Sequence, residues 1–258
     1  MTRSVKMPAS YPAIVENRGG KGRAILVCEH ASKAIPPRWG DLGLTAAQRE
    51  AHIAWDIGAL GLARGLERRL DAVLVHAPVS RLVYDCNRAP DQPGAIAERS
   101  EMHQIPGNTA LDAAERAERT ESVYLPFHEG LHAEITRRIA LGLSPVLVTI
   151  HSFTPQWHGR PRDLEFGIIH DADDRLARAV LAGVAPTGLR AALNQPYAAS
   201  DDVTHTLKLH ALPYGLPNVM LELRNDLIAT PEAQEAMADR LAPALAAALT
   251  AGAHEMAG

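Results

Sequence analysis

The stretch VLVTIHSF, residues 146–153, decides the fold class of this chain. It is the clearest buried strand in the sequence, because its apolar run is unbroken and rich in β-branched side chains. A helical pattern over residues 111–141 precedes it, and a second apolar run at residues 165–171 follows it. Strands that alternate with helices predict an α/β fold, in which helices cover both faces of a parallel or mixed sheet.

The same reading extends toward both ends of the chain. Further strands are expected at residues 24–28, 72–76, 80–85, 165–171 and 218–226, and helices at residues 45–70, 111–141, 173–182 and from Pro231 onward. Thr45 followed by Gln48 is typical of a capping box that begins a helix, and we expect an interruption of the second helix near Pro126. These elements predict a three-layer α/β sandwich with a mixed, mostly parallel central sheet.

The length and composition of the chain fit one large globular domain. The chain has 258 residues, and we expect a single domain over residues 1–258 with residues 1–22 as an N-terminal arm. A net charge of −4 without any basic run argues against a nucleic-acid partner. No apolar run reaches the roughly 18 residues of a membrane span, so no membrane association is expected.

The N-terminus and the cysteines predict a cytoplasmic location. The first 20 residues lack the apolar core of a secretion signal. Cys28 falls within a predicted strand and Cys86 directly follows one, which is typical of reduced thiols and not of a disulfide scaffold.

Polar residues gather where the predicted strands end. They are Glu29 and His30, Asp85 with Asn87 and Arg88, His151, and Glu222 with Arg224. Parallel strands share an end, and α/β sheets bind ligands beyond the carboxyl ends of their strands. We therefore expect these side chains to converge on one site.

Two of the acids stand out by their surroundings. Glu222 lies within VMLEL, where a buried carboxylate must be paired, metal-bound or protonated. His52 and Asp56 would share one helix face, and Asp56 is flanked by Trp55 and Ile57, so that face is not expected to be the solvated one. Two imidazoles and one carboxylate from separate elements form a common zinc site, in which the bound water has a pKa of about 7.

The succession of short motifs resembles a known family. The motifs are CEHAS, HIAWDIGA, SRLVYDCNR, IPGN, TIHSF and LELRND, spread from residue 24 to residue 227. In this order they resemble the N-formylglutamate amidohydrolases, which are related to the zinc exopeptidases and to aspartoacylase. The resemblance implies a zinc-exopeptidase-like fold and hydrolysis of an N-acyl amino acid, most simply N-formyl-L-glutamate to formate and glutamate. One branch of this family acts in histidine catabolism.

The resemblance also implies roles for particular residues. By position, His30 and His151 match the two metal-ligating histidines, and Glu222 matches the carboxylate that activates water. Zinc is the expected ion, although cobalt or manganese would fit the same donors. Arg81, Asp85, Asn87 and Arg88 resemble the substrate-holding segment of aspartoacylase-like enzymes. Arg224 and His210, in and just before the last strand, are further candidates for substrate contact.

The third metal ligand departs from the pattern of the relatives. Zinc exopeptidases use His-x-x-Glu, but the residue three positions after His30 is Lys33, which cannot replace a carboxylate. Asp56 and Glu29 are the two candidates. We prefer Asp56, on the predicted helix, because Glu29 and His30 are neighbours on an extended strand and point to opposite faces.

Two rival functions remain at this point. The first is an amidohydrolase that acts on a different N-acyl amino acid or on a peptidoglycan-type amide. The second is a non-catalytic protein that binds small carboxylates through its arginines.

Overall fold

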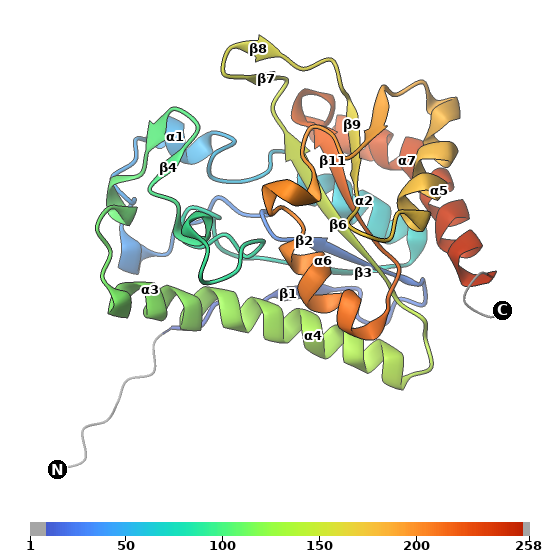
Figure 1. Ribbon diagram of the computed structural model, residues 1–258, viewed down its shortest axis with the longest axis horizontal. Coiled ribbons are helices and arrows are strands. Elements are labelled where there is room, and N and C mark those ends of the chain that lie inside the picture. The colour runs from blue at the N-terminus through green and yellow to red at the C-terminus, as the bar shows by residue number, and fades with distance from the viewer. Residues whose placement is uncertain (1–8, 255–258) are drawn as a thin grey trace.

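Seven strands form one mixed sheet in the computed structural model, which describes residues 9–254 (Figure 1). They are β1 (Ile14–Glu16), β2 (Ala24–Cys28), β3 (Val73–His76), β6 (Val146–Phe153), β9 (Phe166–Ile169), β10 (Ala191–Leu193) and β11 (Asn218–Arg224). Their order across the sheet is β1-β3-β2-β6-β11-β9-β10. The central strands β3, β2, β6 and β11 run parallel, and the outer strands β1, β9 and β10 run in the opposite direction.

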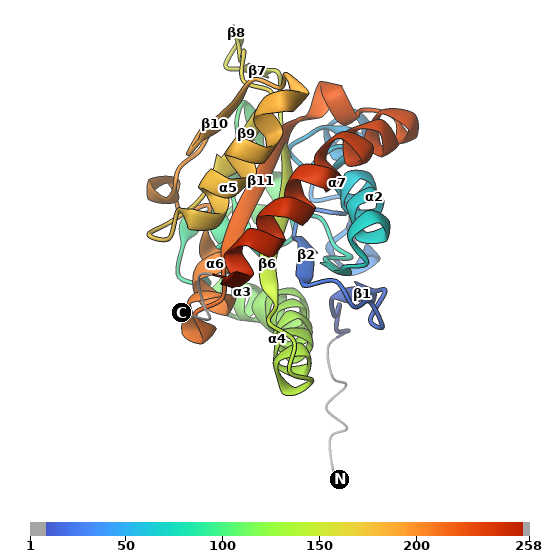
Figure 2. The same cartoon turned by 90° about the vertical axis from the view of Figure 1, so that its right-hand side faces the viewer.

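Helices cover both faces of this sheet. They are α1 (Ala46–Glu50), α2 (Ala59–Leu70), α3 (Ala113–Arg119), α4 (Leu125–Ala140), α5 (Arg175–Val184), α6 (His205–His210) and α7 (Pro231–His254). Helices α2, α5 and α7 pack together on one face, and α4 and α6 lie on the other (Figures 1 and 2). The predicted three-layer α/β sandwich with a mixed, mostly parallel sheet is confirmed.

The buried strands supply two hydrophobic layers at once. In β2, Leu26 and Cys28 pack toward α2 and α7, whereas Ile25 and Val27 pack toward α4 and α6. Side chains alternate between the faces of a strand, so a strand covered on both sides must be apolar at successive positions. Each buried Leu or Ile contributes about 1.5–3 kcal/mol, which fixes the carboxyl ends of these strands firmly.

The predicted strand at residues 80–85 is wrong. Ser80 begins a turn there: its hydroxyl accepts the amide of Leu82 at 3.2 Å, and its carbonyl accepts the amide of Val83 at 2.9 Å. Such local hydrogen bonds compete with strand pairing. Both edges of β3 are also already occupied, by β1 and β2, so the segment has no free partner beside that strand.

The predicted helix over residues 45–70 is two helices. The capping box of Thr45 and Gln48 is present and begins α1, but α1 ends at Glu50. The chain then turns until Gly58, which has a φ of +80° and precedes α2. A Cβ at Gly58 would lie 2.1 Å from the carbonyl oxygen of Ile228, so only glycine fits this approach. Asp56 therefore lies in a loop and shares no helix face with His52.

Side-chain contacts and a short hairpin order the region from residue 89 to residue 141. The two-stranded hairpin, β4 (Arg99–Ser100) and β5 (His103–Gln104), lies in the long loop between β3 and α3. The buried guanidinium of Arg119 holds the loop by donating to Asn108 at 2.7 Å. A π-helical turn joins α3 to α4, and Pro126 occupies the first turn of α4, where its missing N–H is tolerated.

Several short elements escaped the sequence analysis because they are too short to show a period. They include the edge strands β1 and β10, helix α6, and a second hairpin of β7 (Gln156–Trp157) and β8 (Arg160–Pro161). Strand β1 belongs to the predicted N-terminal arm, of which residues 1–8 lie outside the described part. Within the described residues, no helix has the length and apolar character needed to span a bilayer.

Candidate metal centre and active site

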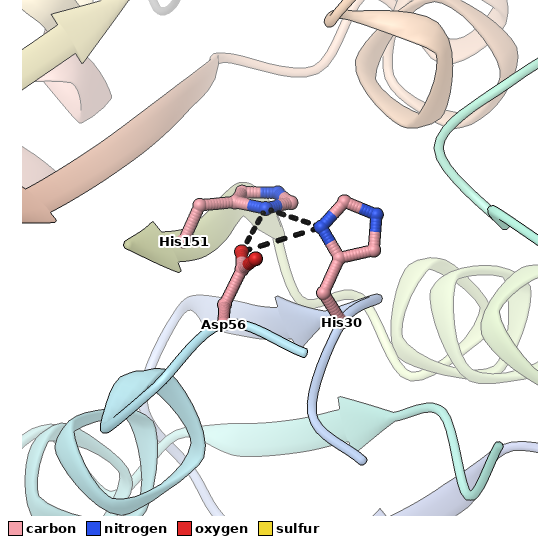
Figure 3. Close-up of side chains that lie close together, drawn as sticks. All are labelled: His30, Asp56 and His151. Atoms are coloured by element: carbon pink, nitrogen blue, oxygen red, sulfur yellow. Dashed lines mark hydrogen bonds and ion pairs between the residues drawn. The ribbon is translucent and has the colours of Figure 1, made fainter. Parts of the chain in front are cut away.

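Three buried side chains from separate segments meet at the carboxyl end of the sheet (Figure 3). His30 follows β2, Asp56 lies in the loop before α2, and His151 lies near the end of β6. Oδ2 of Asp56 is 3.2 Å from Nδ1 of His30 and 2.9 Å from Nδ1 of His151. The two Nδ1 atoms are themselves 3.2 Å apart. Of the two acids considered from the sequence, Asp56 is the one that joins the histidines.

The donor set fits a divalent metal ion. One ligand atom from each of the three residues lies within 4.8 Å of the others. Two imidazole nitrogens and one carboxylate oxygen are typical ligands of a zinc site that keeps a further position open. With the proton of each histidine on Nε2, which faces a second carboxylate, the two Nδ1 lone pairs and the Asp56 oxygen face one another, and a cation satisfies all three. The cluster of His30, Asp56 and His151 is therefore a candidate metal site.

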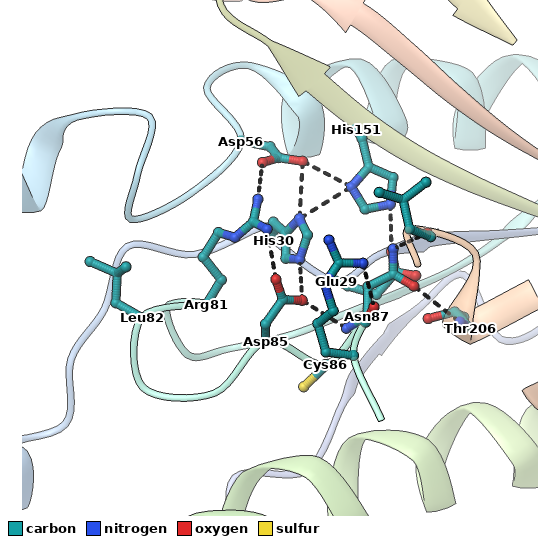
Figure 4. A network of polar contacts seen from close by, with 12 residues as sticks. Glu29, His30, Asp56, Arg81, Leu82, Asp85, Cys86, Asn87, His151 and Thr206 are labelled. Atoms are coloured by element: carbon teal, nitrogen blue, oxygen red, sulfur yellow. Dashed lines mark hydrogen bonds and ion pairs between the residues drawn. The ribbon is translucent and has the colours of Figure 1, made fainter. Parts of the chain in front are cut away.

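Asp85 sets the orientation of the His30 ring (Figure 4). Its Oδ1 accepts Nε2–H of His30 at 2.7 Å and the backbone amide of Asn87 at 2.9 Å, and its Oδ2 accepts Arg81 at 2.6 Å. Although burial opposes it, Arg81 and His30 hold the pKa of Asp85 well below its usual value. A proton on Nε2 leaves Nδ1 of His30 as the free ligand atom, which is the usual arrangement behind a metal-ligating histidine.

Glu29 faces the other nitrogen of the second histidine. Its Oε2 lies 3.2 Å from Nε2 of His151, and both side chains are buried. Although burial opposes both shifts, His151 lowers the pKa of Glu29, and Glu29 and Asp56 raise the pKa of His151. Each histidine of the cluster thus turns Nδ1 inward and Nε2 toward a buried carboxylate. Glu29 therefore lies where it can orient the ring of His151, and it is outside the three-residue cluster.

We expect Glu29→Gln to weaken divalent metal binding about 10- to 100-fold, the usual effect of losing an outer carboxylate. The fold should be retained, because glutamine has the same shape. Competition with a metal chelator measures the affinity. Glu16→Gln is the matched control, since Glu16 makes the same kind of contact with His76, at 2.8 Å, and neither residue belongs to the cluster or lines the cavity beside it. Equal affinity in the Glu29 and Glu16 variants would show that Glu29 does not position His151.

A cavity of about 540 Å³ opens beside the cluster and brings Glu222 to it. Glu222 stands next to His151 in the register of β11 against β6. Its carboxyl is buried, and its Oε2 has no hydrogen-bond partner among the described residues. Burial raises the pKa of Glu222 to about 7. A carboxyl of this kind can exchange a proton near neutral pH.

The substrate-binding candidates of the segment 81–88 divide into two groups. Arg81 and Arg88 line the cavity and offer guanidinium groups to it. Arg81 is also paired with Asp85 at 2.6 Å and with Asp56 at 3.4 Å. The side-chain amide of Asn87, by contrast, is occupied at both ends, because it donates to the carbonyl of Val203 at 2.6 Å and accepts the amide of residue 206 at 3.0 Å. Asn87 thereby holds the segment before α6 against the site.

The structure does not bring His210 or Arg224 to the cavity lining. Arg224 turns away at the end of β11 and donates to Asp226 at 2.8 Å. His210 is buried against α4, where its Nε2 lies 2.7 Å from Nδ1 of His128. Nε2 of His128 lies 2.9 Å from the carbonyl oxygen of Cys86. The expected substrate contact of His210 and Arg224 is not supported by their positions.

The buried pair of His128 and His210 predicts a loss of stability in acid. Burial lowers the pKa of His128 to about 3 and that of His210 to about 4. Below pH 6.5 or so the unfolded chain binds protons that the folded pair excludes, so acidification toward pH 4 favours unfolding. His210→Gln should reduce the slope of the unfolding free energy against pH by about 1.4 kcal/mol per pH unit. Urea unfolding at pH 7 and pH 5 measures it, with the exposed His158→Gln as control; an unchanged slope contradicts the prediction.

Sequence reasoning missed part of the cavity wall. Trp157, Arg162 and Tyr197 line it, and they come from the β7–β8 hairpin and from the segment after β10. Neither segment carries a recognisable motif. The backbone amide of Ser152 also lies 3.3 Å from Oδ2 of Asp56, a contact that only the geometry reveals.

A buried carboxyl next to a candidate metal site, at the carboxyl ends of parallel strands, is the arrangement of a hydrolase. Comparison with protein families identifies the particular kind of hydrolase. The model of the family "N-formylglutamate amidohydrolase" matches residues 22–229, and the chain belongs to this family. It is therefore a hydrolase that acts on linear amide C–N bonds.

Two solved structures are similar over nearly the whole chain. A gene product of Agrobacterium tumefaciens has 51% sequence identity and a TM-score of 0.92, with 94% of this chain and 96% of that chain covered. An N-formylglutamate amidohydrolase from Ralstonia eutropha JMP134 has 18% identity and a TM-score of 0.67, with 94% and 99% covered, and shares the fold. A search of curated proteins finds no match.

Proposed function

We propose that this protein is a zinc-dependent enzyme that hydrolyses N-formyl-L-glutamate to formate and L-glutamate. One observation carries the proposal: the buried carboxyl of Glu222, whose Oε2 has no hydrogen-bond partner in the part of the chain that the structure describes, lies beside His151 of the three-residue cluster at the same cavity. Family membership supports the substrate, an N-formyl derivative of an acidic amino acid.

His30, Asp56 and His151 would hold the metal ion, with Nδ1 of each histidine and Oδ2 of Asp56 as the ligand atoms. Zinc at this position would act as a Lewis acid and lower the pKa of water to about 7. Asp85 and Glu29 would hold the two imidazole rings in place. Cobalt or manganese would accept the same donors.

Glu222 is the proposed general base and general acid. Its carboxylate takes a proton from the water that attacks the formyl carbon. It then gives this proton to the nitrogen of the leaving glutamate as the C–N bond breaks, so the products are formate and the free amino acid. Proton transfer by a positioned carboxyl contributes about 10²- to 10⁴-fold to a rate. A pKa of about 7 suits a carboxyl group that must both accept and donate a proton.

Arg81 and Arg88 are the proposed contacts of the substrate's α-carboxylate. Both line the cavity, and guanidinium groups bind carboxylates through two parallel hydrogen bonds. Arg81 would also stabilise the charge that develops on the formyl oxygen. Asp85 and Asn87 support these residues from behind, Asp85 by pairing with Arg81 and Asn87 by fixing the neighbouring segment.

A substrate panel tests this proposal. Purified protein is assayed with N-formyl-L-glutamate, N-acetyl-L-glutamate, N-formylated neutral amino acids and a peptidoglycan-type amide. We expect the highest kcat/KM for N-formyl-L-glutamate. A clear preference for the acetyl compound or for the peptidoglycan amide would show that the enzyme acts on another substrate. Binding without any turnover of the panel would support a carboxylate-binding protein.

A cytoplasmic location and a role in histidine catabolism belong to the same proposal. Both cysteines are free and buried, as is common for proteins of a reducing compartment. Histidine catabolism is the setting in which N-formylglutamate hydrolysis is expected from the resemblance to the family.

A further inference from the structure

Arg162 lies in the cavity wall inside a frame of aromatic rings. It follows β8, and its guanidinium carbon is 4.9 Å from the ring centre of Trp157, 5.3 Å from that of Tyr197 and 5.5 Å from that of Phe153. All four side chains line the same cavity as Glu222 and the histidine cluster. The rings hold the guanidinium in one place and restrict the access of water to it.

The charge of Arg162 is not neutralised within the described residues. No carboxylate there lies within ion-pair distance of it; its side-chain hydrogen bond goes to the hydroxyl of Tyr197 at 3.3 Å. Asp201 lines the same cavity, but its Oδ2 accepts the backbone amide of Ala198 at 2.9 Å. Arg81 differs, because it is paired with two carboxylates. A partly buried cation without a counter-ion, at the wall of a binding cavity, is suited to an anionic ligand.

Tyr197 connects this wall to the reacting end of the cavity. Burial and the carboxylate of Glu222 raise the pKa of Tyr197, while Arg162 and Arg81 oppose the shift. The phenol thus lies within electrostatic reach of Arg162, Arg81 and Glu222. The backbone of Arg162 is fixed as well, since its carbonyl accepts Arg224 at 3.1 Å and its amide donates to residue 155 at 2.8 Å.

We propose that Arg162 binds the side-chain carboxylate of the substrate and thereby selects N-acyl amino acids with an acidic side chain. The inference rests on the proposed function and adds the residue that distinguishes glutamate from its neutral analogues. The guanidinium has N–H groups left over from its bond to Tyr197, enough for two parallel hydrogen bonds to a carboxylate. A carboxamide in that place supplies no negative charge for Arg162.

The test compares kcat/KM for N-formyl-L-glutamate and N-formyl-L-glutamine in four proteins: the wild type, Arg162→Gln, Arg162→Lys and Arg160→Gln. Arg160 is the matched control, because it is exposed on the same hairpin, opposite Trp157. The wild type should prefer the glutamate compound by about 100-fold, as expected for a charge-assisted pair. Arg162→Gln should lose most of this preference, because its kcat/KM for the glutamate compound falls toward that for the glutamine compound.

Arg162→Lys should retain part of the preference, because lysine keeps the charge but not the paired geometry. Arg160→Gln should behave as the wild type does. A full preference in Arg162→Gln, or the same loss in Arg160→Gln, would overturn the assignment of Arg162. Failure of the proposed function is distinguishable, because the wild type would then hydrolyse neither formyl compound. Calorimetric titration with glutarate, which should bind the wild type more tightly than Arg162→Gln, tests Arg162 in that event too.

Discussion

Replacement of Glu222 by glutamine is expected to lower kcat for N-formyl-L-glutamate about 10²- to 10⁴-fold. Glutamine preserves the shape of the side chain but cannot take a proton from water or return it to the leaving amine. Because Glu222 lies outside the three-residue cluster, metal content and thermal stability should stay close to those of the wild type. Steady-state kinetics, together with metal analysis of the same preparation, measures both effects.

Glu165→Gln is the matched control for this experiment. Glu165 immediately precedes β9 and is paired with Arg190 at 3.1 Å, away from the cavity lining. Its replacement should leave kcat unchanged. If Glu222→Gln retains kcat within a few-fold of the wild type while binding its metal normally, another group must move the proton.

Replacement of Asp56 by alanine is expected to remove metal binding and activity together. Asp56 contributes the oxygen that both histidines face, and it also pairs with Arg81. Although burial opposes it, the two imidazoles hold the pKa of Asp56 below its usual value, so the carboxylate is charged and ready to bind a cation. Loss of a direct ligand should cost more than the roughly 10- to 100-fold expected for an outer carboxylate such as Glu29.

Metal affinity and kcat/KM of Asp56→Ala are compared with those of Asp226→Asn. Asp226 is a partly exposed carboxylate that pairs with Arg224 and does not line the cavity. The control should match the wild type in both measurements. An Asp56 variant that binds zinc as tightly as the wild type would remove Asp56 from the metal site and reopen the assignment of the third ligand.

The sequence was most informative where residues sit at the ends of central strands. His151 and Glu222 lie within long apolar runs whose strand character is plain, and a polar residue at such a position is unusual enough to stand out. His30 is the second residue after β2, and β2, β6 and β11 run in the same direction, so the carboxyl ends of these strands bring His30 near His151 and Glu222. The sheet and these three residues of the site were therefore predictable.

The loops around the site were not predictable in the same way. Asp56 was expected on a helix because the apolar spacing continues through residues 45–70, but hydrogen bonds to distant backbone decide the path there: the amide of Asp56 donates to the carbonyl of His30 at 2.9 Å. Arg162 was missed because two short hairpin strands and the stacking on aromatic rings leave no periodic signal. Asn87 was expected to bind substrate, and only the contacts of its amide reveal that it holds residues 203–206.

The most direct test of the account is the hydrolysis of N-formyl-L-glutamate before and after removal of bound metal. The purified protein is stripped with a chelator, its metal content is measured, and zinc is then restored in known amounts. The account predicts that activity falls with the metal and returns as about one zinc ion binds per chain, the number that one three-ligand site would hold. Full activity in metal-free protein would contradict it.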